Sequence, residues 1–202
     1  MSIRKIGIIG AGLMGNGIAH AALISGFDVV LVDAFAAALD KGLATIHKNM
    51  DRQVSKATIT EADKASALAR LTSSTDYHAL AGTDIVIEAV PESLPVKEAI
   101  YAELKDVLAP ETILASNTSS ISITALAALS GRPDKFIGLH FFNPVPMMKL
   151  VEIIRGLATS ENTYELATKL AAQLNKTAAV ALDAPGSVSY THLRAHETVL
   201  DL

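Results

Sequence analysis

The sequence predicts an α/β fold in which helices cover a doubly wound, mostly parallel sheet. Short apolar runs alternate with segments whose apolar residues recur every three or four positions, which is typical of buried strands separated by helices. A glycine-rich turn joins the first run to the first helix. Half of the 202 residues are hydrophobic, enough for a substantial core. We expect one α/β domain, or one domain and part of another.

The elements follow in order along the chain. Strands are expected at 5–10, 28–33, 84–90, 112–116, 135–141, 149–154 and 177–182. Helices are expected at 12–26, 96–107 and 161–174, with a short one after residue 120. This alternation favours parallel strands joined by crossover helices.

The interval between the second and third strands is too long for a simple crossover. Apolar residues with helical spacing begin it: Phe35, Leu39, Leu43, Ile46, Met50 and Val54. The stretch "TEAD", from Thr60 to Asp63, resembles a capping box that opens a second helix. We therefore expect residues 34–75 to form a helical hairpin arm inserted in the domain.

Composition excludes several classes of protein. The net charge is −4 and no basic block stands out, which argues against a nucleic-acid-binding protein. The absence of Cys removes disulfides, thiolate zinc sites and a cysteine nucleophile, and fits a reducing cytoplasm. Glycines interrupt the apolar stretch near the N-terminus, so we expect neither a signal peptide nor a membrane span there.

The first strand ends in a G-x-G-x-x-G motif that opens a helix, as in Rossmann-like dinucleotide-binding domains. Gly10 permits the tight turn, Gly12 lets the backbone approach a pyrophosphate, and Gly15 lets helix and strand pack closely. Asp33 ends the second strand, where a carboxylate accepts hydrogen bonds from the ribose of NAD and repels the extra phosphate of NADP. The expected cofactor contacts here are Gly10, Gly12, Leu13, Met14, Gly15 and Asp33. The alternatives are a flavin or other nucleotide site, or a simple packing turn.

Two polar residues lie in the apolar runs 135–141 and 149–154. His140 ends the first run, and Glu152 lies in the middle of the second, where a carboxylate needs a partner. A turn containing Asn143 and two prolines could bring them together as an acid–base pair, with Glu152 orienting the imidazole. A purely structural pair is equally compatible with these residue types. Two ligands without a third do not make a metal site, so none is expected.

A polar stretch, "ASNTSS" at 115–120, follows another strand end. Its hydroxyl and amide groups could donate to a substrate oxygen. A Ser/Thr-rich helix cap explains the same residues.

These motifs together resemble the NAD-dependent (S)-3-hydroxyacyl-CoA dehydrogenase family, especially its bacterial 3-hydroxybutyryl-CoA members. The resemblance rests on "IGIIGAGLMGNGIA", "IVIEAVPE", "ILASNTSS" and "IGLHFFNPVPMMKLVEII", and extends from Ile6 to Gly186. It implies NAD as the cofactor and oxidation of the 3-hydroxyl group of an acyl-CoA.

The resemblance also implies roles for individual residues. His140 is the expected catalytic base, Glu152 its orienting partner, and Ser119 the hydrogen-bond partner of the reacting oxygen. The resemblance implies further cofactor contacts at Ser119, Glu92, Lys97 and Asn143. In the family the helical arm contacts coenzyme A, so Lys56 is a candidate for its phosphates, although "SKAT" departs from the usual Lys-Gly-Lys pattern.

The resemblance stops at Gly186. The family continues "DAPGFVVNR" into an all-helical C-terminal domain that supplies most of a homodimer interface, and Tyr190 stands where the family has a catalytic-site Asn. The segment 188–198, "VSYTHLRAHET", resembles translated adapter DNA from transposase-made sequencing libraries. We therefore expect residues 1–186 to form the NAD-binding domain, 187–202 to be a non-native tail, and the helical domain to be missing.

The sequence thus predicts the cofactor domain of a cytoplasmic 3-hydroxyacyl-CoA dehydrogenase acting on short chains, with an acyl-CoA as its partner. One alternative is a dehydrogenase of a non-CoA hydroxy acid or sugar acid. Another is a non-catalytic NAD-binding protein, or an inactive fragment.

Overall fold

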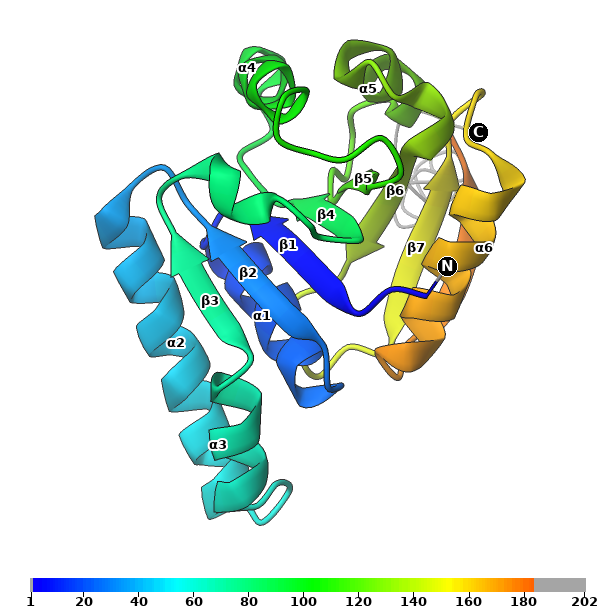
Figure 1. The fold of residues 1–202 in the computed structure, drawn as a ribbon. Coiled ribbons are helices and arrows are strands. Elements are labelled where there is room, and N and C mark those ends of the chain that lie inside the picture. The colour runs from blue at the N-terminus through cyan, green and yellow to red at the C-terminus, as the bar shows by residue number, and fades with distance from the viewer. Residues whose placement is uncertain (1, 184–202) are drawn as a thin grey trace, which may run out of the picture.

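The computed structural model describes residues 2–183 as an α/β domain built on a single eight-stranded sheet (Figure 1). The proposed non-native tail, 187–202, lies outside the described residues. The strands are β1 Lys5–Ile9, β2 Asp28–Val32, β3 Leu71–Ser74, β4 Ile85–Glu88, β5 Ile113–Ser116, β6 Phe136–Phe141, β7 Leu150–Arg155 and β8 Thr177–Leu182. The helices are α1 Leu13–Ile24, α2 Ala36–Ser55, α3 Glu61–Leu68, α4 Leu94–Leu104, α5 Ile123–Ser130 and α6 Glu161–Gln173, with short 3₁₀ turns η1 Tyr77–Leu80 and η2 Pro133–Lys135.

The strand order is β3-β2-β1-β4-β5-β6-β7-β8. All neighbours are parallel except β6 and β7, which are antiparallel. The chain leaves β1 in one direction to β2 and later returns on the other side of β1 to β4. In open sheets of this kind, ligands bind beyond the carboxyl ends of the strands at this switch point. The predicted mostly parallel, doubly wound sheet is confirmed.

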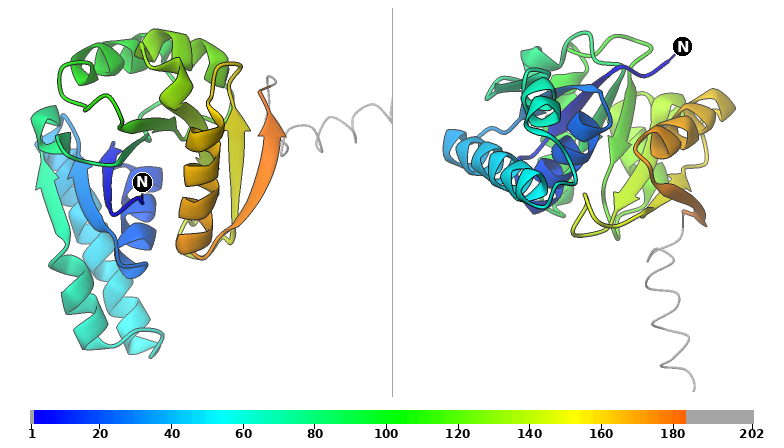
Figure 2. Two further views of the ribbon diagram at one scale, coloured as in Figure 1. Left: turned by 45° about the vertical axis from the view of Figure 1, so that its right-hand side comes forward. Right: turned by 90° about the horizontal axis from the view of Figure 1, so that it is seen from below.

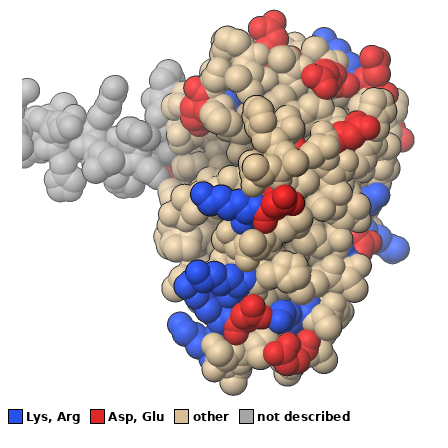
Figure 3. Space-filling view, turned by 90° about the vertical axis from the view of Figure 1, so that its left-hand side faces the viewer, with Lys and Arg blue, Asp and Glu red and all other residues tan. Residues whose placement is uncertain are grey.

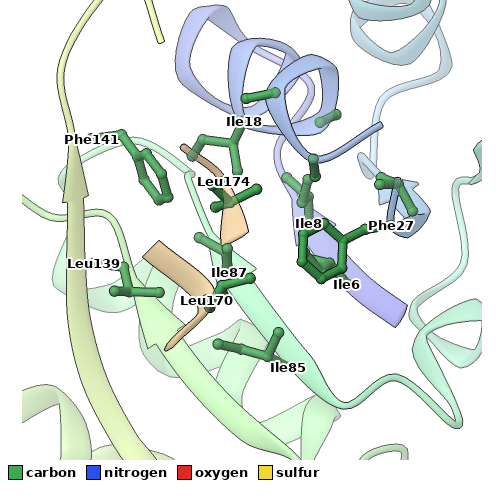
Figure 4. Close-up of a cluster of buried hydrophobic side chains, with 14 of the residues drawn as sticks. Ile6, Ile8, Ile18, Phe27, Ile85, Ile87, Leu139, Phe141, Leu170 and Leu174 are labelled. Carbon is green, nitrogen blue, oxygen red and sulfur yellow. The ribbon is translucent and has the colours of Figure 1, made fainter. Parts of the chain in front are cut away.

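Helices cover both faces of the sheet (Figure 2). Each face has its own hydrophobic core. On one face α1 and α6 pack on the sheet, and α2 packs against α1. Ile6 and Ile8 of β1 lie in the same cluster as Ile18, Leu170 and Leu174 (Figure 4). On the other face α4 and α5 enclose the second cluster. Strands that are buried on both faces need apolar residues at every position, which explains the continuous apolar runs.

Helices α2 and α3 form the predicted hairpin arm, which extends past the sheet in Figure 1. The capping box at its second helix is present: Thr60 accepts from the Asp63 amide, and the Asp63 side chain accepts from the Thr60 amide. Two details differ from expectation. Residues 71–74 of the predicted arm form the edge strand β3, and Phe35, expected on the buried face, precedes the helix and is 75% exposed.

Candidate active site

The glycine loop between β1 and α1 has the geometry that close approach requires. Gly10 has a φ of +97°, and a Cβ there would lie 2.7 Å from the Ala89 carbonyl oxygen. A Cβ on Gly15 would lie 1.7 Å from the Gly10 carbonyl oxygen, whereas one on Gly12 would meet nothing within 4 Å. The first turn of α1 carries no acidic side chain, and no side chain caps it. This helix terminus is therefore open to an anionic group.

A cleft of about 430 Å³ lies over this loop at the carboxyl ends of β1, β2 and β4. Its lining includes Gly10, Gly12, Leu13, Met14 and Asp33, together with apolar side chains from 35–38 and from α4. A polar rim of backbone amides beside an apolar chamber suits the diphosphate and the adenine of a dinucleotide.

Asp33 holds the loop together as well as lining the cleft. Its carboxylate accepts from the Ala11 amide at 2.8 Å and from the Phe35 amide at 3.0 Å. A carboxylate has about four lone-pair positions, so it retains capacity to accept from ribose hydroxyls. Five of the six predicted cofactor residues of the first βαβ unit thus line one cleft, and they fit NAD; Gly15 does not line it and instead packs against the Gly10 carbonyl.

Glu92 and Ser119, two further predicted residues, lie in direct contact. Glu92 Oε1 accepts from the Ser119 amide at 2.7 Å and from Ser119 Oγ at 3.3 Å. The same carboxylate accepts from Thr118 Oγ1 at 2.8 and 2.9 Å. Glu92 therefore connects the segment after β4 to the polar loop after β5.

Lys97 is placed differently from a simple cofactor contact. Its side chain is 1% exposed, and its ammonium donates to both carboxylate oxygens of Glu88 at 2.7 and 2.8 Å. It lies 3.8 Å from Glu92 Oε2. Lys97 therefore bonds Glu88 directly and lies within ion-pair distance of Glu92.

Glu88, which the sequence analysis missed, is the centre of this buried network. It is fully buried and also accepts from Tyr101 Oη at 3.0 Å, Ser116 Oγ at 2.9 Å and the Val90 amide at 2.8 Å. Burial and the neighbouring Glu88 carboxylate raise the pKa of Tyr101 far above its ordinary value, which keeps its hydroxyl a donor. The sequence did contain a signal of this network. Glu88 ends the apolar run 85–88, and a buried carboxylate needs partners.

The structure brings His140 and Glu152 together. They face each other directly in the antiparallel β6–β7 pair, and His140 Nδ1 lies 2.7 Å from Glu152 Oε2. Glu152 is 1% exposed and His140 is 13% exposed, so the carboxylate is sealed while the ring reaches the surface. The Phe142 ring packs beside the imidazole at 4.7 Å between centroids. With Nδ1–H donating to the carboxylate, Nε2 keeps the lone pair that a base needs.

Two further predicted contacts, Asn143 and Lys56, are exposed side chains. Asn143 is exposed in the loop between β6 and β7, and no described residue bonds its side chain. Lys56 follows α2 at the end of the arm and is also exposed. Basic and acidic side chains are interspersed on the face that Figure 3 shows, so this face carries no continuous basic patch.

Two features are absent from the described part of the chain. No helix there combines the length and apolar character needed to span a membrane. Among residues 2–183, no three His, Asp or Glu side chains are grouped to hold a metal ion.

Residues 5–184 match the family model described as "3-hydroxyacyl-CoA dehydrogenase, NAD binding domain". The chain belongs to this family. NAD is therefore the cofactor of this domain.

Members of the family from several bacteria are similar over nearly the whole chain. The 3-hydroxybutyryl-CoA dehydrogenase of Bradyrhizobium diazoefficiens is 53% identical over 92% of this chain, which spans 64% of that protein. The crystal structure of (S)-3-hydroxybutyryl-CoA dehydrogenase from Ralstonia eutropha superposes with a TM-score of 0.92 at 52% identity, over 95% of this chain and 68% of that one. The 3-hydroxyadipyl-CoA dehydrogenase of Escherichia coli is 42% identical over 93% of this chain and 40% of its own.

Proposed function

We propose that the complete protein oxidises (S)-3-hydroxyacyl-CoA to 3-oxoacyl-CoA with NAD, and that 3-hydroxybutyryl-CoA is its preferred substrate. The observation that carries this proposal is the His140–Glu152 pair, bonded at 2.7 Å at the carboxyl end of β6. Oxidation of a secondary alcohol needs a base for the hydroxyl proton, and a neutral imidazole held by a carboxylate supplies one. Bound NAD would accept the hydride from C3.

Each side chain then has a defined task. His140 takes the hydroxyl proton at Nε2 and returns it in the reverse direction, while Glu152 fixes the ring and stabilises the imidazolium. Ser119 hydrogen-bonds the reacting oxygen. Glu92 positions Ser119 and, with Asn143, contacts the cofactor, while Lys97 supports Glu92.

The remaining proposals concern the rest of the protein. Lys56 would bind coenzyme A phosphates from the arm. Residues 1–186 would be the NAD-binding domain, and residues 187–202 would replace the start of a helical C-terminal domain that forms a homodimer in the native protein. The protein would act in the cytoplasm on a small-molecule acyl-CoA, without nucleic acid or membrane partners.

The test uses the gene re-sequenced beyond the Gly186 codon and the complete protein made from it. We expect turnover of 3-hydroxybutyryl-CoA with NAD, and His140→Ala to lose about 10²- to 10⁴-fold in kcat while NAD affinity is retained. The exposed His47→Ala, in the arm, is the matched control. Normal kcat in His140→Ala would refute the assignment.

A comparison of substrates decides between the alternatives. The same hydroxy acid with and without its CoA ester should differ strongly in kcat/KM. Equal turnover of the free acid would favour a dehydrogenase of non-CoA hydroxy acids. NAD binding without turnover by the complete protein would favour a non-catalytic binding protein.

A further inference from the structure

The two chain segments that carry Ser119 and His140 are joined by a side chain with no role so far. The register of β5 against β6 extends only to Ser116, opposite Gly138. Beyond this point Asn117 continues the connection, because its Oδ1 accepts from the Phe141 amide at 2.9 Å. The Asn117 amide in turn donates to the Glu88 carbonyl oxygen at 2.8 Å. One residue thus ties together the ends of β4, β5 and β6.

The location of this contact makes it significant. Phe141 directly follows His140 and is 2% exposed, so its amide has little access to water. Leaving the buried Phe141 amide without a partner would cost free energy, so its hydrogen bond to Asn117 stabilises the folded chain. Asn117 is also two residues before Ser119, whose own amide is held by Glu92. His140 therefore directly precedes one partner of this hydrogen bond, Phe141. Ser119 lies two residues after the other partner, Asn117.

We propose that Asn117 is a positioning residue that sets the separation of His140 and Ser119. This inference rests on the proposed function, because both groups must act on one hydroxyl. Asn117 acts through the main chain of Phe141 and not on the reacting atoms. A small displacement of the two groups is enough to slow proton and hydride transfer, since reacting atoms must be held within a narrow range of geometry.

The first experiment measures hydrogen exchange of the Phe141 amide by NMR, which requires no turnover. In the wild-type chain this amide should be protected. In Asn117→Ala it should exchange at least tenfold faster, while amides in the middle of β1 and β4 keep their rates. Unchanged protection of Phe141 in Asn117→Ala would overturn the inference.

The second experiment compares Asn117→Ala with Asn117→Asp in the complete enzyme. The aspartate retains an acceptor for the Phe141 amide. We expect Asn117→Ala to lose at least tenfold in kcat, with a larger primary isotope effect from deuterium at C3 and a KM for NAD within about threefold of wild type. Asn117→Asp should keep kcat within about threefold at the plateau of its own pH profile, because the added carboxylate changes the local charge.

A matched control lies at the other end of the same strand. Thr112 Oγ1 donates to the Thr83 carbonyl oxygen at 2.9 Å and is also buried. Thr112→Val removes a comparable hydrogen bond, to Thr83, at the start of β5. This is the end of the strand remote from His140. It should lower the melting temperature without changing the isotope effect, which separates positioning from general stability.

The other outcomes are equally decisive. If Asn117→Asp is as slow as Asn117→Ala while Phe141 stays protected in it, the amide nitrogen acts directly on a ligand and the inference is wrong. If Asn117→Ala fails to fold, Asn117→Ser replaces it, because its shorter side chain cannot reach the Phe141 amide. A wild-type enzyme without turnover of any 3-hydroxyacyl-CoA would refute the proposed function, whereas amide exchange would still decide whether Asn117 holds Phe141.

Discussion

Lys97 and Glu88 form an ion pair in which the two side chains are 1% and 0% exposed. Breaking a buried pair leaves one charge without a partner, which destabilises a protein by about 3–5 kcal/mol. We expect Glu88→Gln and Lys97→Met each to lower the free energy of unfolding by about this amount. The double variant, which buries no charge, should recover much of it. Urea unfolding of the variants gives these values; additive losses in the double variant would contradict the explanation.

Gly12 and Gly15 should separate cofactor binding from folding. In Gly12→Ala the new Cβ meets nothing within 4 Å, so the unfolding free energy should change by less than about 1 kcal/mol while NAD affinity falls at least about tenfold. In Gly15→Ala the Cβ would overlap the Gly10 carbonyl oxygen, so the loss in stability should be about 3 kcal/mol or more. Calorimetric titration with NAD and urea unfolding test both; normal NAD binding by Gly12→Ala would exclude close approach of the cofactor at this glycine.

Asp33 should determine the preference for NAD over NADP. Asp33→Asn removes the charge that repels a 2′-phosphate and weakens the acceptor for the ribose hydroxyls, each effect worth about 1.5–3 kcal/mol. The ratio of NADPH to NADH dissociation constants should therefore fall at least about tenfold. Fluorescence titration of the two reduced cofactors measures this ratio. An unchanged ratio would assign the preference to other residues of the cleft.

His20 should make stability depend on pH. This α1 residue is 1% exposed, and its Nε2 lies 2.8 Å from Gln53 Oε1 in the arm. Burial lowers the pKa of His20 below its ordinary value of 6.5, and the hydrogen bond to Gln53 opposes this only in part. The unfolded chain therefore takes up the proton first on acidification. The stabilisation is complete above pH about 6.5 and is lost as the pH falls toward the lower pKa of the folded state.

The measurement for His20 is the unfolding free energy between pH about 5 and about 8. His20→Gln, which cannot take up a proton, should show a smaller loss on the acid side. A wild-type protein whose stability rises on acidification in this range would contradict the prediction.

Much of the fold could be predicted because its strands are buried on both faces. Such strands require uninterrupted apolar residues, and that pattern is visible without a structure. Strand β3 could not be found this way. Its "LTSS" sequence is polar and partly exposed at the sheet edge, and pairing with β2 alone makes it a strand. The expectation for Phe35 was wrong for another reason. Helical spacing alone did not reveal that the helix begins after this residue.

The candidate site likewise contains residues that the sequence could reveal and residues that it could not. His140 and Glu152 could be paired in advance because each is a polar exception within an apolar run. Glu88, Tyr101 and Ser116 are far apart along the chain, and only the stacking of β4, α4 and β5 brings them together. Lys97 illustrates the limit of a motif: the resemblance implied a cofactor contact, whereas the burial of Lys97 and its bond to Glu88 depend on three-dimensional packing.

The cross-strand register of His140 and Glu152 has a consequence for how this protein tolerates change in length. Insertion of one residue within β6 or β7 would move one partner to the opposite face of the sheet and separate the pair. Insertions between residues 142 and 149 would leave the register intact, because the pairing of the strands does not depend on the length of their connection. The length of the connecting segment can therefore change while His140 and Glu152 stay opposite each other across β6 and β7.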